Sequence, residues 1–223
     1  MLTYTVYTKP QFNEDLVAHK LLYDILNDCY VNPGVALKYA IDEADTLYCA
    51  YYSSILVGFF FHRWKPDYVE LNGKTIGISR MILGAVDHNH KNNGIFKYLL
   101  EKIQSDIRTN QNNTTYHALY GRTGSILAFR GLSKVFPNIE PNIKGEYSKD
   151  GFDLATQISK TYFANSFSDK KNPFALKNTT KHILSDAERE ILSRELKKSM
   201  NNLFAGFQVD EKEGDRLLYI IKT

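Results

Sequence analysis

The residues of this chain that are best suited to chemistry form a polar turn, KNNG at residues 91–94, between an apolar segment and an amphipathic helix. A helix that begins at a turn leaves its first N–H groups without partners inside the helix, at the positive end of the helix dipole. Phosphates bind to such groups, and a residue without a Cβ lets the backbone approach them. Lys91 adds a positive charge, so the turn predicts a site for the phosphates of a nucleotide cofactor. The alternative is a single glycine in a connection that binds nothing.

Two histidines lie just before this turn. In an extended segment His88 and His90 would share a face beside Asp87, which is the beginning of a metal site. The other four histidines fall in separate predicted elements, and we therefore expect no metal. They are His19, His62, His117 and His182. The alternative role for His88 is that of a general base acting through water, because imidazole exchanges protons near neutral pH.

The turn needs a sheet and helices to hold it, and hydrophobic periodicity predicts both. The strands predicted before the turn span residues 3–7, 46–53, 55–64 and 75–86, and the helices span 13–30 and 35–44. Asn72 and Gly73 are a strong signal for a hairpin turn. The nearly continuous apolar character of residues 75–86 is typical of a central strand that is covered on both faces.

The rest of the chain is predicted to complete one α/β domain. Its predicted elements are a helix after Gly94, a strand at 115–121, helices at 125–136 and near 153–163, and a closing strand at 215–222. Ser125 is the predicted N-cap of the helix that follows it. Ser185 and Glu188 form a capping box that begins a further helix. We expect a core at about 2–137 and a C-terminal elaboration at about 138–223.

Composition argues against several classes of protein. The 223 residues are 43% hydrophobic, with 13 Phe and 15 Tyr, which supports a folded core. A net charge of +3 is too small for a face that binds nucleic acid. Cys29 and Cys49 make no disulfide framework and are expected to be buried thiols. The first residues lack a secretory pattern, and the longest apolar run, ILVGFFF, is too short for a bilayer, so we expect a cytoplasmic protein without membrane contact.

The order of elements resembles the GNAT superfamily of N-acetyltransferases. That family's pyrophosphate turn reads Gln/Arg-x-x-Gly-x-Gly/Ala, and here Lys91, Gly94 and Phe96 occupy its three defined places. The segments ILGAVDHNH and SILAFRGLSKVF resemble the strand before that turn and the helix after the fifth strand. The resemblance covers residues 2–137 and the closing strand. It implies a mixed α/β fold, with a mostly antiparallel central sheet flanked by helices and a C-terminal helical extension.

The resemblance also implies a site for acetyl-CoA or another acyl-CoA as co-substrate. The implied ligands of the pyrophosphate are the backbone amides of Asn92, Asn93, Gly94 and Ile95, beside Lys91. The implied partners of the pantetheine arm, bound like a short added strand, are the backbone groups of Ala85, Val86 and Asp87. The strands at 75–86 and 115–121 would splay apart around the thioester. Ser125 and Arg122 would face the cofactor or the acceptor, although a solvated turn with an N-cap is equally consistent with their positions.

Four residues depart from the family pattern. Lys91 replaces Gln or Arg and keeps a donor and a charge. Phe96 replaces a small residue, and it would either crowd the diphosphate or turn into the core. The family's tyrosine acid falls at Leu132, which cannot donate a proton, and a glutamate base found in some members falls at about Arg80. Tyr120, at the end of its strand, is a substitute acid by position, with a core aromatic as the alternative.

We therefore predict an acyl-CoA-dependent N-acyltransferase that moves acetyl from acetyl-CoA to a primary amine of a small molecule or peptide by direct attack. The departures at Phe96 and Leu132 motivate the alternative, which is a non-catalytic binding or scaffold module of the same fold. Residues 138–203 would shape the acceptor pocket or a homodimer contact.

Overall fold

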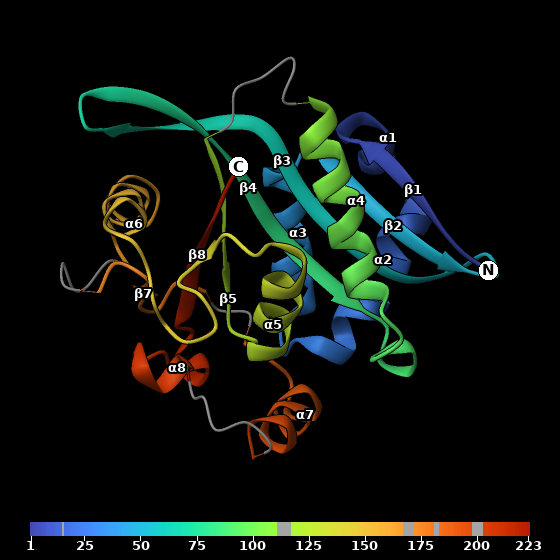
Figure 1. Cartoon of the computed structure of the whole chain (residues 1–223). Coiled ribbons are helices and arrows are strands. Elements are labelled where there is room, and N and C mark those ends of the chain that lie inside the picture. The colour runs from blue at the N-terminus through green and yellow to red at the C-terminus, as the bar shows by residue number, and fades with distance from the viewer. Residues whose placement is uncertain (15, 111–116, 167–171, 181–182, 198–202) are drawn as a thin grey trace.

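A computed structural model of the chain describes residues 1–14, 16–110, 117–166, 172–180, 183–197 and 203–223. It contains a central sheet with helices on both faces (Figure 1). The strands are β1 (Leu2–Thr8), β2 (Thr46–Tyr52), β3 (Ile55–Leu71), β4 (Lys74–Val86), β5 (Ala118–Thr123), β6 (Ile139–Glu140), β7 (Ala175–Leu176) and β8 (Arg216–Lys222). The helices are α1 (Lys9–Glu14), α2 (Leu16–Cys29), α3 (Pro33–Glu43), α4 (Ile95–Asn110), α5 (Ile126–Val135), α6 (Lys149–Tyr162), α7 (Asp186–Lys197) and α8 (Leu203–Gly206).

The sheet runs in the order β1-β2-β3-β4-β5-β8-β6, and β7 pairs with β8. Within the described residues every pair is antiparallel except that of β4 with β5. The long β3–β4 hairpin turns at Asn72 and Gly73, which both have positive φ, as a type I′ turn requires. The predicted hairpin turn is therefore confirmed, as is the mixed, mostly antiparallel sheet flanked by helices.

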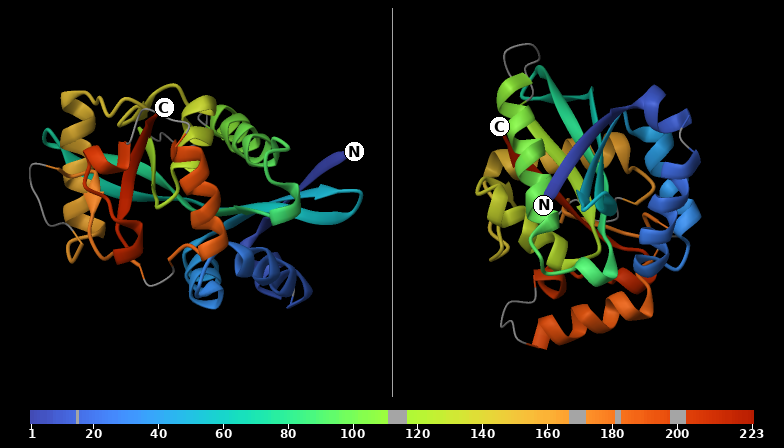
Figure 2. Two further views of the ribbon diagram at one scale, coloured as in Figure 1. Left: turned by 90° about the horizontal axis from the view of Figure 1, so that it is seen from below. Right: turned by 90° about the vertical axis from the view of Figure 1, so that its right-hand side faces the viewer.

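Two layers of helices cover the sheet (Figure 2). On one face α2 and α3 pack with Phe59, Phe61 and Leu83 in one apolar cluster. On the other face α4 and α5 pack with Phe60 and Met81 in a second cluster. Neighbouring residues of β3 and β4 thus face different layers, which is why these strands are apolar nearly throughout and lie at the centre of the sheet.

The C-terminal part of the chain contributes to the sheet and also bridges the two helical layers. Strand β8 lies between β5 and β6, and α6 packs against β3 and β8. Helix α7 contacts both α2 and α5, which belong to opposite layers. It therefore crosses the end of the molecule at which β4 leads into α4 (Figures 1 and 2).

Some boundaries differ from the sequence-based predictions. The helix predicted at 13–30 corresponds to the end of α1 and to α2, and residue 15 lies outside the described residues. Strand β3 continues past residue 64 to Leu71, but its pairing with β4 is irregular between Arg63 and Asp67. Pro66 lies in this interval and has no N–H to donate to a ladder. Residues 115–116 of the predicted strand lie outside the described residues.

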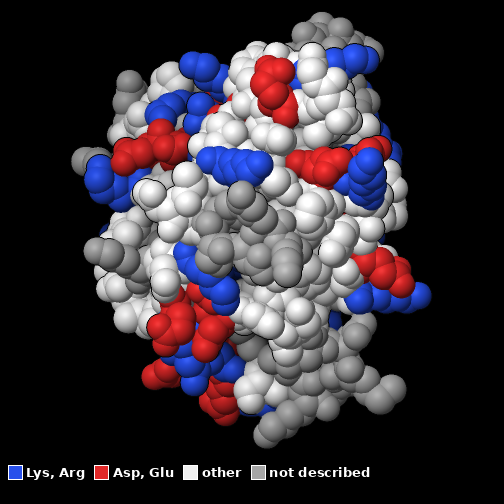
Figure 3. Space-filling model, turned by 90° about the vertical axis from the view of Figure 1, so that its left-hand side faces the viewer, with Lys and Arg blue, Asp and Glu red and all other residues white. Residues whose placement is uncertain are grey.

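The surface shows no separation of charge on the face drawn in Figure 3, where basic and acidic side chains lie side by side. Among the described residues, no helix has both the length and the apolar character that crossing a bilayer requires. The absence of nucleic-acid and membrane partners remains a prediction.

Candidate active site

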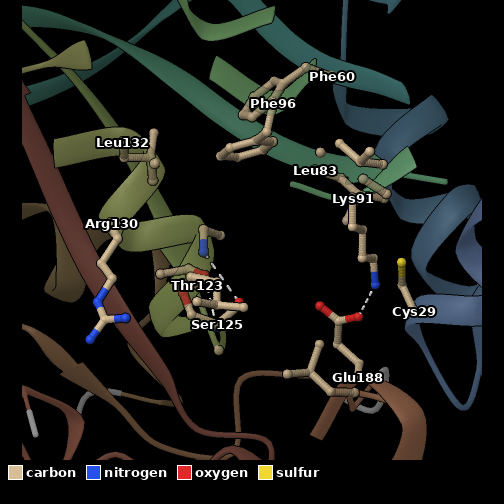
Figure 4. A pocket seen from close by; sticks show the side chains of 18 of the residues that line it. Cys29, Phe60, Leu83, Lys91, Phe96, Thr123, Ser125, Arg130, Leu132 and Glu188 are labelled. Carbon is tan, nitrogen blue, oxygen red and sulfur yellow. Dashed lines mark hydrogen bonds and ion pairs between the residues drawn. The ribbon is translucent and has the colours of Figure 1, made fainter. Parts of the chain in front are cut away.

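A cavity opens where β4 and β5 part. The two strands pair in parallel only from Ile78 with Ala118 to Met81 with Gly121. Beyond that point β4 continues to Val86 with β3 as its partner, whereas β5 continues with β8. The edge of β4 that faced β5 therefore has no partner strand from residue 82 onward among the described residues. The cavity has a volume of about 880 Å³, and it is lined by the ends of β4 and β5 and by the starts of α4 and α5 (Figure 4).

The β4 strand is irregular at the same point. Phe61 pairs with Leu83 and His62 with Met81, so Ile82 is an extra residue on β4. Such a bulge leaves its extra residue out of the ladder and turns the strand. Ile82 and Leu83 both line the cavity. The bulge therefore lies at the wall of the cavity, where the β4 edge loses β5 as its partner.

The polar turn forms one end of the cavity. Gly94 has φ +76°, a conformation that favours glycine, and its carbonyl accepts a hydrogen bond from the Tyr98 amide at 2.9 Å. Helix α4 begins at the next residue, so its first amides and its dipole face this end. Of the predicted cofactor residues, the cavity is lined by Ala85, Val86, Lys91, Asn92, Gly94, Ile95 and Ser125. Their role in binding the cofactor stays a prediction.

Two predicted cofactor residues, Asp87 and Asn93, are not among the described lining residues. The Asp87 carboxylate is engaged locally, because it accepts hydrogen bonds from the Asn89 amide at 3.0 Å and from His90 Nδ1 at 2.6 Å. His88 is exposed and lines the cavity. No group of three or more His, Cys, Asp or Glu is placed to hold a metal within the residues that the structure describes.

The cavity is strongly basic. Its charged lining residues are Lys91, Lys97, Arg122, Arg130, Lys134, Arg194 and Arg216, with Glu188 as the one acid among the described ones. Lys97, Arg194 and Arg216 pair with Glu101, Glu190 and Glu211, which are not among the described lining residues. The cations still outnumber the acids at the cavity wall, and a positive potential in a concave site favours an anionic ligand. The net charge of +3 concealed this feature, because the excess is gathered in one place.

Glu188 comes from α7 and pairs with Lys91 (Figure 4). Both side chains are largely buried, at 13% and 18% exposed. The Ser185 hydroxyl accepts from the Glu188 amide at 3.2 Å, which confirms half of the predicted capping box. The other half is wrong, because the Glu188 carboxylate bonds Lys91 and the Ser185 amide donates to the Cys29 carbonyl. The C-terminal elaboration thus neutralises the lysine of the polar turn.

Phe96 forms part of the cavity wall. Its ring lies 6.0 Å from the ring of Phe60, centroid to centroid, and packs against the core. A Cβ on Gly131 would come within 2.8 Å of Phe96 Cδ1, and one on Gly84 within 3.1 Å of Phe96 Cε2. The glycine inside α5 therefore makes room for this ring. Phe96 turns toward the core, as one of the two sequence alternatives proposed, and it narrows the slot between β4 and α5.

Tyr219 of β8 reaches the point at which β4 and β5 part. It pairs with Gly121, and a Cβ on that glycine would overlap the Tyr219 hydroxyl and lie 2.8 Å from the Met81 carbonyl oxygen. The residue is 3% exposed and lines the cavity, and burial raises the pKa of its hydroxyl. The structure gives that hydroxyl no hydrogen-bond partner among the described residues. Sequence analysis missed Tyr219, because an aromatic in the apolar run LLYIIK is typical of a core position.

Tyr120 is placed differently. Its hydroxyl donates to Asp67 Oδ2 at 2.5 Å and accepts from Arg80 Nε at 2.6 Å. Arg80 also pairs with Asp67 at 2.8 Å and with Glu43 at 2.9 Å. Burial, followed by the nearby Asp67 charge, raises the pKa of Tyr120, whereas Arg80 lowers it. Tyr120 is fully buried and is not among the described lining residues, so its predicted role as the acid finds no geometric support.

Ser125 has the structural role that the sequence predicts. It precedes α5, and its hydroxyl accepts from the Ala128 amide at 3.3 Å, which confirms it as the N-cap. It also lines the cavity. The second role proposed for Ser125, contact with cofactor or acceptor, stays a prediction.

Comparison with known proteins supports the fold. No protein-family model matches the chain, and no curated protein matches it in sequence. Among solved structures, the IAA acetyltransferase from Bacillus cereus aligns over 100% of both chains, with a TM-score of 0.50 and 10% identity. The ribosomal-protein-S18-alanine N-acetyltransferase from Escherichia coli aligns with 61% of this chain and 81% of its own, with a TM-score of 0.43 and 12% identity.

A GCN5-related N-acetyltransferase from Anabaena variabilis aligns with 58% of this chain, with a TM-score of 0.43 and 11% identity. This chain spans only 31% of the length of that protein. At such identities the likeness concerns the fold alone, and the full-length alignment with the Bacillus protein is the one on which the fold comparison rests.

Proposed function

We propose that this chain, which has the fold of the GNAT superfamily of N-acetyltransferases, transfers an acyl group, acetyl in the first place, from an acyl-CoA to a primary amine. One observation carries the proposal: a basic cavity joins a glycine turn at the start of α4 to the gap between β4 and β5. Coenzyme A carries phosphates at one end and a thioester at the other, joined by an extended arm. The polar turn can bind the phosphates, and the narrow slot beside Phe96 can hold the thioester.

Different groups of the chain would bind different parts of coenzyme A. The amides that begin α4 and the Lys91 ammonium would hold the pyrophosphate, since a helix N-terminus favours anions. Lys97 of α4 and Arg130 and Lys134 of α5 line the same cavity and would meet the remaining phosphate. The unpaired edge of β4 at residues 82–86 would pair with the amides of the arm, as an added strand does.

The reaction requires two proton movements. The amine nitrogen attacks the thioester carbonyl carbon, so a C–N bond forms and the C–S bond breaks. The nitrogen loses a proton and the sulfur gains one, which leaves an amide and free coenzyme A. We assign the Tyr219 hydroxyl as the donor to sulfur, because it lies at the gap and burial keeps it protonated. Main-chain N–H groups at the Ile82 bulge would stabilise the carbonyl oxygen as it becomes negative.

Removal of the amine proton falls to solvent or to His88. His88 lines the cavity and is exposed, so it would act through water, as we predicted. Positioning and oxyanion donation supply much of such catalysis without a strong base.

A ligand series tests the proposal. A ligand that binds only the folded state at about 100 times its Kd raises stability by about 2.7 kcal/mol. For a domain of this size that is a rise in Tm of about 5–10 °C. We expect acetyl-CoA and CoA at 1 mM to produce such a rise and ATP, which lacks the arm, to produce much less. Thiol release from acetyl-CoA that depends on an added amine would establish the transfer; no shift with acetyl-CoA would refute the proposal.

The Lys91–Glu188 pair is the observation that favours the alternative, a non-catalytic module. A carboxylate at the polar turn opposes phosphate binding, since like charges raise the free energy of the complex. That alternative predicts acetyl-CoA binding that is weak or absent, and no amine-dependent release of thiol.

A further inference from the structure

A second basic group lies in the cavity on the side of α3, away from the α4 turn. Arg122, at the end of β5, lines the cavity, and its Cζ lies 5.3 Å from the ring centroid of Tyr39 and 5.2 Å from that of Phe163. The guanidinium is thus held between two aromatic faces, an arrangement that fixes its orientation. Arg216, at the start of β8, lines the same part of the cavity and is 4% exposed.

The two arginines differ in the carboxylates beside them. Glu211 lies 3.8 Å from Arg216 Nη2, but it also pairs with Arg189 Nε at 3.1 Å. Arg122 Nη1 donates to the Thr179 carbonyl oxygen at 3.2 Å, and no carboxylate lies within ion-pair distance of Arg122 among the residues that the structure describes. Burial lowers the pKa of Arg122, as expected for a cation without a carboxylate partner.

Arg80, by contrast, has carboxylate partners that balance its charge. Arg80, two strand positions before the gap, pairs with Asp67 at 2.8 Å and with Glu43 at 2.9 Å. A buried charge without such partners is costly, and an anionic ligand would supply the missing partner. Arg122 is therefore the residue at which the cavity lacks an anion.

We propose that the acceptor amine carries an acidic group, a carboxylate or a phosphate, that binds the Arg122 guanidinium. The inference rests on the proposed acyl transfer and names the class of its acceptor. Arg122 is one residue beyond Gly121, where the strands part, so its side chain and the Tyr219 hydroxyl bracket the gap from opposite faces. The planar guanidinium binds a carboxylate or a phosphate through two hydrogen bonds, so a small amino acid or a short amine with a terminal phosphate is the class of acceptor that it suits.

The same arginines also help the amine to react. Cations beside the acceptor disfavour its protonated form, and only the neutral amine has a lone pair to attack the carbonyl. A diamine or a polyamine would bring further positive charge to this site and would be disfavoured.

Matched pairs of acceptors test the proposal. Glycine is compared with glycinamide, and O-phosphoethanolamine with ethanolamine, by amine-dependent thiol release from acetyl-CoA at equal concentrations of unprotonated amine. We expect the acidic member of at least one pair to have a kcat/KM higher by about 10- to 100-fold, the range of a charge-assisted hydrogen bond. The pair that shows the larger ratio distinguishes carboxylate from phosphate.

Variants locate the effect. Arg122→Gln should bring the ratio of kcat/KM between the acidic and the neutral amine near one, and it should not change the affinity for acetyl-CoA in calorimetry. Arg122→Lys should keep part of the preference for the acidic amine. Arg130→Gln is the control, because Arg130 lines the cavity from α5: it should weaken acetyl-CoA binding and leave the ratio intact.

Direct binding makes the test independent of turnover. The same four amines are added without acetyl-CoA, and the Tm of thermal denaturation is measured. An acidic amine should raise the Tm of the wild-type protein and should not raise that of the Arg122→Gln variant. The inference is overturned if the enzyme prefers the neutral amines. It is also overturned if an acidic amine is neither acylated nor able to stabilise the protein. Failure of the proposed function is a separate result, seen as no acetyl-CoA binding and no thiol release with any amine.

Discussion

Replacing Tyr219 by Phe removes one hydroxyl from the point where β4 and β5 part and leaves the ring in place. Since a proton donor contributes about 10²- to 10⁴-fold, kcat should fall by that factor, which is about 2.7–5.4 kcal/mol on the barrier. The KM for acetyl-CoA should change little, because the hydroxyl acts only as the thiolate leaves. Stability should stay within about 1 kcal/mol, because the hydroxyl has no hydrogen-bond partner among the described residues to lose.

Tyr120→Phe is the matched control, since it also removes one hydroxyl from a buried tyrosine. Here the hydroxyl bonds Asp67 and Arg80, and hydrogen bonds to charged groups are worth about 1.5–3 kcal/mol each. We expect this variant to lose about 3–6 kcal/mol of stability, hence about 6–24 °C in Tm, with a smaller change in kcat.

Amine-dependent thiol release gives kcat, and thermal denaturation gives stability, for both variants. Burial raises the pKa of Tyr219, so the wild-type rate should not fall at mildly alkaline pH through loss of this proton. If Tyr219→Phe retains most of the wild-type kcat while a stable Tyr120→Phe loses it, the acid is Tyr120 and our reading of the gap is wrong.

Three further predictions concern the turn, α7 and the core. Gly94→Val should weaken acetyl-CoA binding at least about 10-fold in calorimetry, because a β-branched residue is strained at φ +76°; Gly73→Val, with φ +75° and equally open space, should cost similar stability without this loss. Glu188→Gln should tighten acetyl-CoA binding by about 3- to 10-fold, since it leaves the Lys91 charge to the phosphates; weaker binding would contradict the placement of the pyrophosphate. His62 is buried with its pKa lowered from 6.5 to about 3, so only the unfolded chain takes up its proton between these values and stability falls as pH drops below 6.5. The slope reaches about 1.4 kcal/mol per pH unit, and His62→Gln should remove it from denaturation midpoints measured between pH 6.5 and 4.

The sequence by itself determined the features that depend on neighbouring residues. Hydrophobic period and turn chemistry were enough to predict the hairpin at Asn72 and Gly73, the long central strand, the glycine turn before α4 and the N-cap at Ser125. Each of these depends on φ, on side-chain alternation or on a hydrogen bond within a few residues, and the order of such elements was enough to indicate the fold class.

Only the tertiary structure decided which side chains meet in the cavity. Lys91 and Glu188 are 97 positions apart, and the Tyr219 hydroxyl reaches the gap because β8 enters the sheet beside β5. Tyr120 was the candidate acid by its position in the sequence, yet it is bonded to Asp67, 53 positions away. Strand pairing and helix packing bring these residues together through contacts distant in the chain, and no local pattern in the sequence records such contacts.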